Sequence, residues 1–147
     1  MKNKIALIII LAFAVLQAFN PDIVSKELNP ETDFLSNVEA SDDVRIMIKS
    51  SCYDCHSNQP KYPWYAKVAP VSFWINDHIE DGMKHLNFSE WETYPADKKA
   101  HKMEECYEEI GEDEMPLYSY TIMHGDAQYT DEQKEKLIAF FKSQAMK

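Results

Sequence analysis

Glycine is scarce in this sequence, with only three residues among 147. A β protein rich in tight turns uses glycine wherever the backbone needs a positive φ, so this scarcity argues against that class. Basic residues are also outnumbered, by 25 acidic to 15 basic side chains, and the formal net charge is −10. A nucleic-acid-binding protein needs the opposite sign, so we expect no nucleic-acid partner. The acidic balance suits either solubility or contact with a basic protein.

The N-terminus has the pattern of an export signal. Lys2 and Lys4 precede an uncharged apolar run over residues 5–16, and small residues such as Ala18 lie near its end. We expect residues 1–18 to be a signal peptide or an uncleaved anchor, and the run is short for a membrane span. The protein is then exported, to the periplasm or the outer face of the cytoplasmic membrane. Residues 19–40 contain two Asn-Pro steps and no sustained periodicity, which predicts a tether.

The rest of the chain, 41–147, predicts an all-α, cytochrome c-like domain of four to five helices with long loops, because no segment has a convincing strand pattern. The first helix covers 42–51 with Ser41 as its cap, and the second covers 71–85. A third helix follows Pro95 and ends at Gly111. The fourth begins at Thr130, where Gln133 completes a capping box.

One face of the predicted helix 71–85 is apolar, which favours its burial. This face consists of eight residues at helical spacing: Val71, Trp74, Ile75, His78, Ile79, Gly82, Met83 and Leu86. Long loops rich in aromatic residues flank this helix. A helical domain of this size needs something to pack around, and a haem is a large apolar plate.

The segment from Cys52 to His56 reads Cys-Tyr-Asp-Cys-His, the pattern of c-type haem attachment. Two thiols at this spacing can add to the two vinyl groups on one porphyrin edge, and His56 can then place its imidazole under the iron. A thioredoxin-like site would follow a strand, and a zinc site would need a second ligand pair. A disulfide between Cys52 and Cys55 would form a strained ring. Cys106, the third cysteine, lies on a helix stripe and is expected to be buried.

The second axial ligand is less clearly marked. Met115 precedes Pro116, which stiffens the backbone, and it lies 59 residues after His56, so that two helices can wrap the haem between them. We expect Met115 to be the distal ligand, since methionine paired with histidine is a known ligation. His78, on the apolar face, and His124, in the ligand loop, are the competitors. His78 could instead bond a haem propionate.

The surroundings of the haem are predicted in outline. A backbone carbonyl near Pro70 could accept the hydrogen bond of the other His56 ring nitrogen and fix its tautomer. Trp64 and Trp91 could line the haem or bond its propionates, as could Tyr62 and Trp74, although core packing explains each of them equally well.

The segments CYDCHSN (52–58), YPWY (62–65), LNFSEW (86–91) and EMP (114–116) together resemble the small bacterial haem-binding domain proteins often found in the Bacteroidetes group. The resemblance covers roughly residues 40–147. It implies a cytochrome c-like helical domain with one haem c, and it implies no particular partner. The Met-Pro step also looks like the distal-ligand loop of class I cytochromes c.

Electron transfer by a single covalent haem is therefore the leading hypothesis. We expect a redox protein, which a basic surface would suit, as the partner, and the N-terminus as a membrane tether. An electron carrier of this kind is not an enzyme. The alternative is a haem-based gas sensor or a peroxidase, which needs an open or displaceable distal position. A third hypothesis is a thiol-redox or metal module without haem.

Overall fold

The computed structural model describes residues 2–22 and 25–146. Every regular element among these residues is a helix and none is a strand, which confirms the all-α prediction. Met1 and Lys147, and residues 23 and 24 of the predicted tether, lie outside the described residues.

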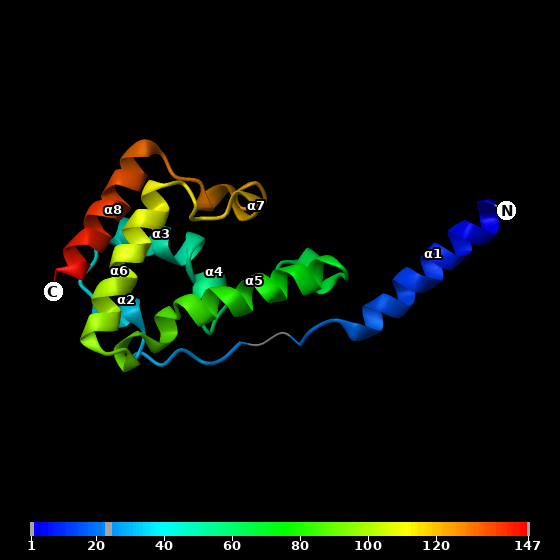
Figure 1. Ribbon diagram of the computed structural model, residues 1–147, viewed down its shortest axis with the longest axis horizontal. Helices are drawn as coiled ribbons and strands as arrows, with labels where there is room; N and C mark the ends of the chain where they lie inside the picture. Colours follow the sequence, from blue (N-terminus) through cyan, green and yellow to red (C-terminus); the bar gives the residue numbers. More distant parts are fainter. Residues whose placement is uncertain (1, 23–24, 147) are drawn as a thin grey trace.

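The N-terminal helix α1, Lys2–Leu16, projects away from the rest of the molecule and continues into the short 3₁₀ helix η1, Gln17–Phe19 (Figure 1). Residues Lys2–Phe19 together are long and apolar enough to cross a membrane, by length and composition alone. None of the α1 side chains is buried within the protein. This segment therefore gains its stability from something other than the helical core.

Four longer helices form the body of the molecule: α3 (Asp42–Ser51), α5 (Val71–His85), α6 (Ala96–Gly111) and α8 (Asp131–Ala145). Their positions match the four predicted helices. At the start of α8, Thr130 accepts from the Gln133 amide while the Gln133 side chain accepts from Thr130, so the predicted capping box is present. Ser41 precedes α3, but its side chain makes no capping hydrogen bond.

Short helical segments precede and connect these four. They are α2 (Phe34–Asn37), α4 (Tyr53–His56), η2 (Trp64–Lys67), η3 (Phe88–Thr93), α7 (Tyr118–Thr121) and η4 (Gly125–Ala127). The loops predicted around the second helix and before the fourth are thus partly helical. Each segment is too short to show helical periodicity in the sequence.

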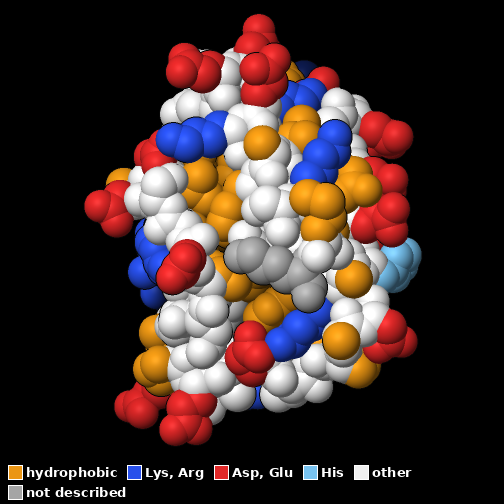
Figure 2. Space-filling model, turned by 90° about the vertical axis from the view of Figure 1, so that its left-hand side faces the viewer, with side chains coloured by type: hydrophobic (Ala, Val, Ile, Leu, Met, Phe, Trp, Pro, Cys, Tyr) orange, Lys and Arg blue, Asp and Glu red, His pale blue; other side chains and the backbone are white. Residues whose placement is uncertain are grey.

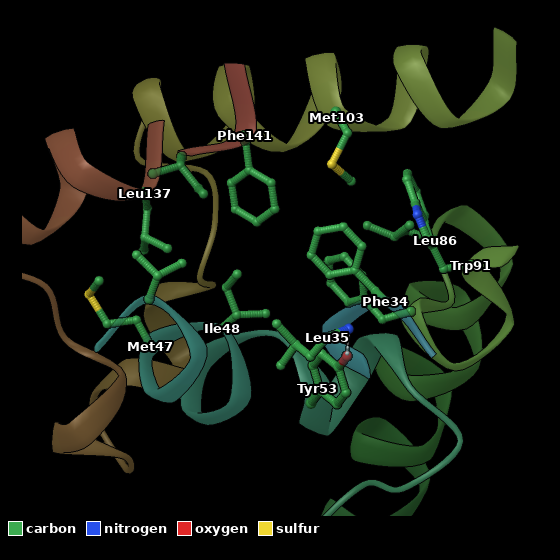
Figure 3. Packing of buried hydrophobic residues seen from close by; sticks show 13 residues of the cluster. Phe34, Leu35, Met47, Ile48, Tyr53, Leu86, Trp91, Met103, Leu137 and Phe141 are labelled. Atoms are coloured by element: carbon green, nitrogen blue, oxygen red, sulfur yellow. Dashed lines mark hydrogen bonds between the residues drawn. The ribbon is translucent and has the colours of Figure 1, made fainter. Parts of the chain in front are cut away.

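The hydrophobic core lies where α6 and α8 pack side by side against α2 and α3 (Figures 1 and 3). Phe34 and Phe141 are fully buried and their rings stack with centroids 6.4 Å apart. The four-residue helix α2 thus supplies a central core residue. The tether predicted for residues 19–40 is wrong over this part, because a Phe-Leu pair that short carries no periodic signal.

Arg45 fastens this segment to α3. Its half-buried guanidinium donates to the backbone carbonyls of Leu35, Val38 and Ala40, the last two at 2.6 and 3.1 Å. Asp33, also buried, caps α2 by accepting from the Ser36 amide. Residues 33–40 are therefore part of the domain.

The apolar face predicted for α5 is buried only in part. Ile79 and Leu86 are buried, whereas Val71 and Trp74 are 40% and 48% exposed. The exposed residues of this face line a cavity. Figure 2 shows the molecule from the left-hand side of Figure 1, the side on which α6 and α8 lie. Acidic and basic side chains are interspersed there with hydrophobic groups.

Candidate haem site

The Cys-Tyr-Asp-Cys-His segment occupies one helical turn at the end of α3. Cys52 closes that helix by donating its amide to the Ile48 carbonyl, and the amides of Cys55 and His56 both donate back to the Cys52 carbonyl, at 3.1 and 2.8 Å. The two thiols and the imidazole therefore stand on one rigid turn, α4. A flexible loop could not hold three such groups in a fixed relation.

Tyr53 anchors this turn from the core side. Its ring stacks on Phe88 with centroids 5.4 Å apart. Its hydroxyl donates to the Asp33 carboxylate at 2.9 Å and accepts from the Leu35 amide at 3.2 Å. Burial is the main cause that raises the Tyr53 pKa, so the hydroxyl stays protonated. The first residue between the two cysteines thus ties the motif to residues 33–35.

Asp54 anchors the other side of the turn. One carboxylate oxygen accepts from the Tyr120 hydroxyl at 2.8 Å and the other accepts from the Lys61 amide at 3.2 Å. Asp54 thus connects the motif to α7 and to the loop before η2. Sequence reasoning missed both Asp33 and Asp54, because nothing in their spacing distinguishes them from surface carboxylates.

The ring of His56 is held by one nitrogen. Its Nδ1 lies 2.9 Å from the Gly82 carbonyl and 3.0 Å from the Leu86 carbonyl at the C-terminal end of α5. Since carbonyls only accept hydrogen bonds, Nδ1 carries the proton and the Nε2 lone pair stays available. Burial lowers the His56 pKa, which favours the neutral form that a metal needs. The acceptor predicted near Pro70 is wrong: the carbonyls come from the other end of the same helix.

Gly82 allows α5 to come this close. A Cβ at this position would lie 2.7 Å from the Cys55 carbonyl oxygen, well inside contact distance. Any larger residue would push α5 away from the motif. The glycine that the sequence places on the apolar face of α5 is therefore needed for the contact between the helix and the haem motif.

A cavity of about 290 Å³ opens beside Cys55, close to the lower limit of about 300 Å³ for small-molecule sites. One wall comes from α5 and the facing wall from the segment that contains α7. The residues that line it include Cys55, Tyr65, Val71, Trp74, Ile75, His78, Ile79, Tyr120, Met123 and His124. The atoms that face the cavity are mainly apolar, as a porphyrin face requires, although Asp54, Lys61 and Ser119 also belong to the lining.

Residues 11–143 match the family model of the haem-binding domain. The chain belongs to the haem-binding domain family. No curated protein and no solved structure matched it. The bacterial group and the likeness to cytochrome c that the resemblance implied remain predictions. The match covers most of the chain, including the motif, both cavity walls and the core segment around Phe34.

The geometry of the haem-binding domain suits a haem in part: Cys55 lines the cavity, whereas Cys52 and His56 lie next to it in the chain but outside the lining. Cys55 stands at the edge of an apolar cavity, and His56 keeps one ring nitrogen free for a metal. A zinc site fits less well, because no group of three or more His, Cys, Asp or Glu side chains comes together among the described residues. The helical turn that carries the motif is thus placed where a haem in the cavity could contact Cys55.

The three cysteines of the haem-binding domain are free thiols. Burial raises the pKa of Cys52 to about 12 and that of Cys55 to about 11. A catalytic redox thiol has a lowered pKa, because the thiolate is the reactive form. Cys106 packs against the core and its pKa is raised well above its usual value by burial. These environments do not suit thiol-redox chemistry.

His124 is held in the cavity wall by two tyrosines. Its Nε2 lies 2.7 Å from the Tyr65 hydroxyl, and its ring stacks on Tyr120 with centroids 4.1 Å apart. His78 faces the same cavity from α5 and bonds through Nδ1 to the Trp74 carbonyl of its own helix, at 2.8 Å. The cavity wall thus contains two imidazoles, and one ring nitrogen of each already has a hydrogen-bond partner.

The other predicted site residues lie outside the cavity lining. Met115 is half-buried in the loop after α6, where its amide donates to the Glu109 carbonyl at 3.1 Å. Trp64 is 77% exposed in η2. Trp91 is 5% exposed and packs edge-on against Phe34 in the core. Of the predicted site residues, the structure therefore brings Cys55 and His78 to the cavity, and it leaves Cys52, His56, Met115, Trp64 and Trp91 outside the cavity lining.

Proposed function

We propose that the protein is an exported monohaem c-type cytochrome that carries electrons, with the haem bound covalently through Cys52 and Cys55. The hydrogen bonds of His56 Nδ1 carry this proposal. They fix the neutral tautomer in which Nε2 can bind iron, and they leave the ring no freedom to turn away. Bound haem supplies a reversible one-electron change at iron, whose potential depends on axial ligands, burial and hydrogen bonds.

The chain's own residues hold this site rigid. Tyr53 and Asp54 lock the attachment turn from both sides, and α5 fixes the imidazole through two carbonyls. The two carbonyls that accept from His56 Nδ1 raise the electron density on the imidazole and so favour the oxidised metal. Such a site changes little between oxidation states, which suits an electron carrier rather than an enzyme.

Covalent attachment is tested by a pyridine haemochrome spectrum of the denatured protein, produced in cells that carry out haem ligation. We expect the spectrum of a porphyrin with both vinyl groups saturated, and an intact mass increased by one haem. Changing Cys106 to serine should leave both results unchanged, because that thiol lies outside the motif. Colourless protein with free thiols at 52 and 55 would contradict the proposal.

Met115 is proposed as the second axial ligand. Pro116 follows it, and four residues further on Tyr120 ties the loop to Asp54 of the motif at 2.8 Å. This bond holds the methionine loop beside the attachment turn. The cavity residue Met123 is the matched alternative, since it is exposed and lies on the same segment.

The ferric protein should show the methionine–iron charge-transfer band near the red edge of the visible spectrum. Met115→Ala should abolish this band, and Met123→Ala should leave it intact. The opposite result would assign the ligand to Met123. A band that survives in both variants would assign the ligand to another methionine, and absence of the band from the unaltered ferric protein would favour His78 or His124.

A second candidate function is gas sensing or peroxidase chemistry. His124, Tyr65 and His78 in the cavity wall favour it, because such groups could assist a molecule bound at iron. It requires a distal position that opens easily. Rapid binding of carbon monoxide to the ferrous protein at neutral pH would support this function, and slow or absent binding supports the electron carrier.

A further inference from the structure

The end of the N-terminal helix is hydrogen-bonded to the domain. The Gln17 side chain accepts from the Ala69 amide at 3.0 Å and donates to the Ala69 carbonyl at 3.2 Å. The Asn20 side chain donates to the Lys67 carbonyl at 3.2 Å and accepts from the Ser72 hydroxyl at 2.6 Å. Ala69 and Ser72 are both buried. Residues 17–20 therefore form a joint that is hydrogen-bonded to the segment at the start of α5. A simple tether would make no such contacts.

Exposed aromatic side chains lie close in the chain to the residues of this joint. Trp64 lies in η2, Phe73 in the first turn of α5 and Phe19 at the end of η1, and they are 77%, 38% and 67% exposed. The exposed Lys67 lies among them in the sequence. None of these four lines the cavity. We call these four residues the aromatic end of the domain.

The helix that leads into this joint has the properties of a membrane span. Residues Lys2–Phe19 are apolar and make an 18-residue helix, which at 1.5 Å per residue is about 27 Å long, close to the ~30 Å of a bilayer core. Lys2 and Lys4 at its start favour a cytoplasmic N-terminus. The domain then lies outside the membrane, with the joint at the level of the lipid headgroups.

Aromatic and lysine side chains are the groups that prefer this headgroup level. Asn20, one residue after Phe19, bonds Lys67 and Ser72, so an anchor that ends at Phe19 would hold Lys67 and Phe73 near the membrane surface, with Trp64 on the same short helix as Lys67. Exposed apolar patches of this kind mark interaction sites. The continuity with the apolar helix identifies the bilayer as the occupant.

We propose that residues 1–18 are retained as a membrane anchor and that the aromatic end docks the domain on the outer bilayer surface. Cleavage after residue 18 would remove Gln17 and break two of the four hydrogen bonds. Val71 and Trp74 belong to the same end of α5 and to the cavity wall, so docking brings the cavity to the membrane surface. This proposal goes beyond electron transfer and holds whatever reaction the haem supports.

The first test is the intact mass of the haem-loaded protein extracted from membranes. Retention of residues 1–18 is expected, and a chain that starts after Ala18 would overturn the proposal. The purified full chain is then placed in lipid nanodiscs, one chain per disc, and exposed to hydroxyl radicals. Each side chain's oxidation rate is divided by its rate in the denatured chain.

Trp64 and Tyr118 are matched for this measurement, since they are 77% and 81% exposed in the protein itself. We expect Trp64 to be oxidised several-fold more slowly than Tyr118, because the bilayer covers it. Equal rates would overturn docking. Protection of Trp64 only in discs that hold two chains would assign the surface to a second copy, which also overturns it.

Gln17→Ala with Asn20→Ala removes the four hydrogen bonds and keeps the anchor and the haem site. Trp64 should then be oxidised at the Tyr118 rate. Protection that survives in this variant would show that haem or the fold covers Trp64, and the proposal would be wrong. A second variant, Trp64→Ser with Phe73→Ser, changes exposed residues only. It should speed the acylation of Lys67 by a membrane-impermeant reagent, and Ile122→Ser should not.

Discussion

At the scale of single residues, the haem site depends on close contacts between backbone atoms of α4 and α5. Gly82 lies against the Cys55 carbonyl, and its own carbonyl accepts from His56. The glycine therefore both permits the approach and supplies one of the two acceptors. Because these partners are backbone atoms, the helix can adjust to a new side chain only by moving as a whole.

Gly82→Ala should destabilise the domain by about 1–3 kcal/mol, the range for an overpacked site, even though alanine is the better helix former. Gly111→Ala is the matched control, because nothing lies within 4 Å of its added Cβ. The control should be neutral or stabilising, by up to about 1 kcal/mol. Urea unfolding of the two variants measures both effects. Equal stabilities would show that α5 is free to move away from the motif.

Tyr120→Phe removes the bond between α7 and the Asp54 carboxylate. Hydrogen bonds to charged groups contribute about 1.5–3 kcal/mol, and this one is half-buried, so we expect a loss of about 1–2 kcal/mol in unfolding free energy. Carbon monoxide should also bind the ferrous protein faster, because the proposed ligand loop is loosened. Tyr118→Phe, on the same short helix but 81% exposed, should change neither measurement.

The roles of individual site residues were only partly readable from the sequence. His56 and both motif cysteines follow from a spacing that has a chemical reason. The partner of His56 does not, since Gly82 and Leu86 act through their carbonyls, and every residue has one. Asp33 and Asp54 are similarly invisible, because their importance comes from burial and from hydroxyl donors that lie 20 and 66 residues away in the chain.

At the scale of elements, the long helices were predictable because each has an apolar stripe and recognisable ends. The bounds 42–51 and 71–85 agree with α3 and α5. Helix α2 was not predictable, since four residues cannot display a repeat of 3.6. The sequence predicts the apolar stripe of α5 correctly. It does not reveal whether the stripe packs against protein or faces a cavity.

The two predicted helix caps differ in the structure, which gives a direct test. Thr130→Ala should cost about 1 kcal/mol of unfolding free energy, because it removes a capping box that satisfies two backbone donors. Ser41→Ala should cost less, since the Ser41 side chain makes no capping bond. Thermal or urea unfolding of the two variants compares them directly. A larger loss for Ser41→Ala would contradict the observed capping.

At the scale of the whole molecule, the net charge of −10 should influence encounters with other proteins. If the partner is basic, long-range attraction raises the association rate, and salt screens it over a Debye length of about 10 Å at 0.1 M. Electron exchange with a basic redox protein should therefore slow as ionic strength rises, and exchange with an acidic one should quicken. Stopped-flow measurements over a range of salt concentrations test this. A rate that does not depend on salt would exclude electrostatic steering.

The pairing of Phe34 with Phe141 has a consequence for how the protein matures. These two rings meet in the centre of the core, yet they come from opposite ends of the domain sequence (Figure 3). The core can therefore close only after the last helix has reached the compartment where the chain folds, and closing such a long loop is slow. During that interval Cys52 and Cys55 are presented on an open chain. If the haem is attached covalently, as proposed, a ligation enzyme can then reach both thiols before folding buries them.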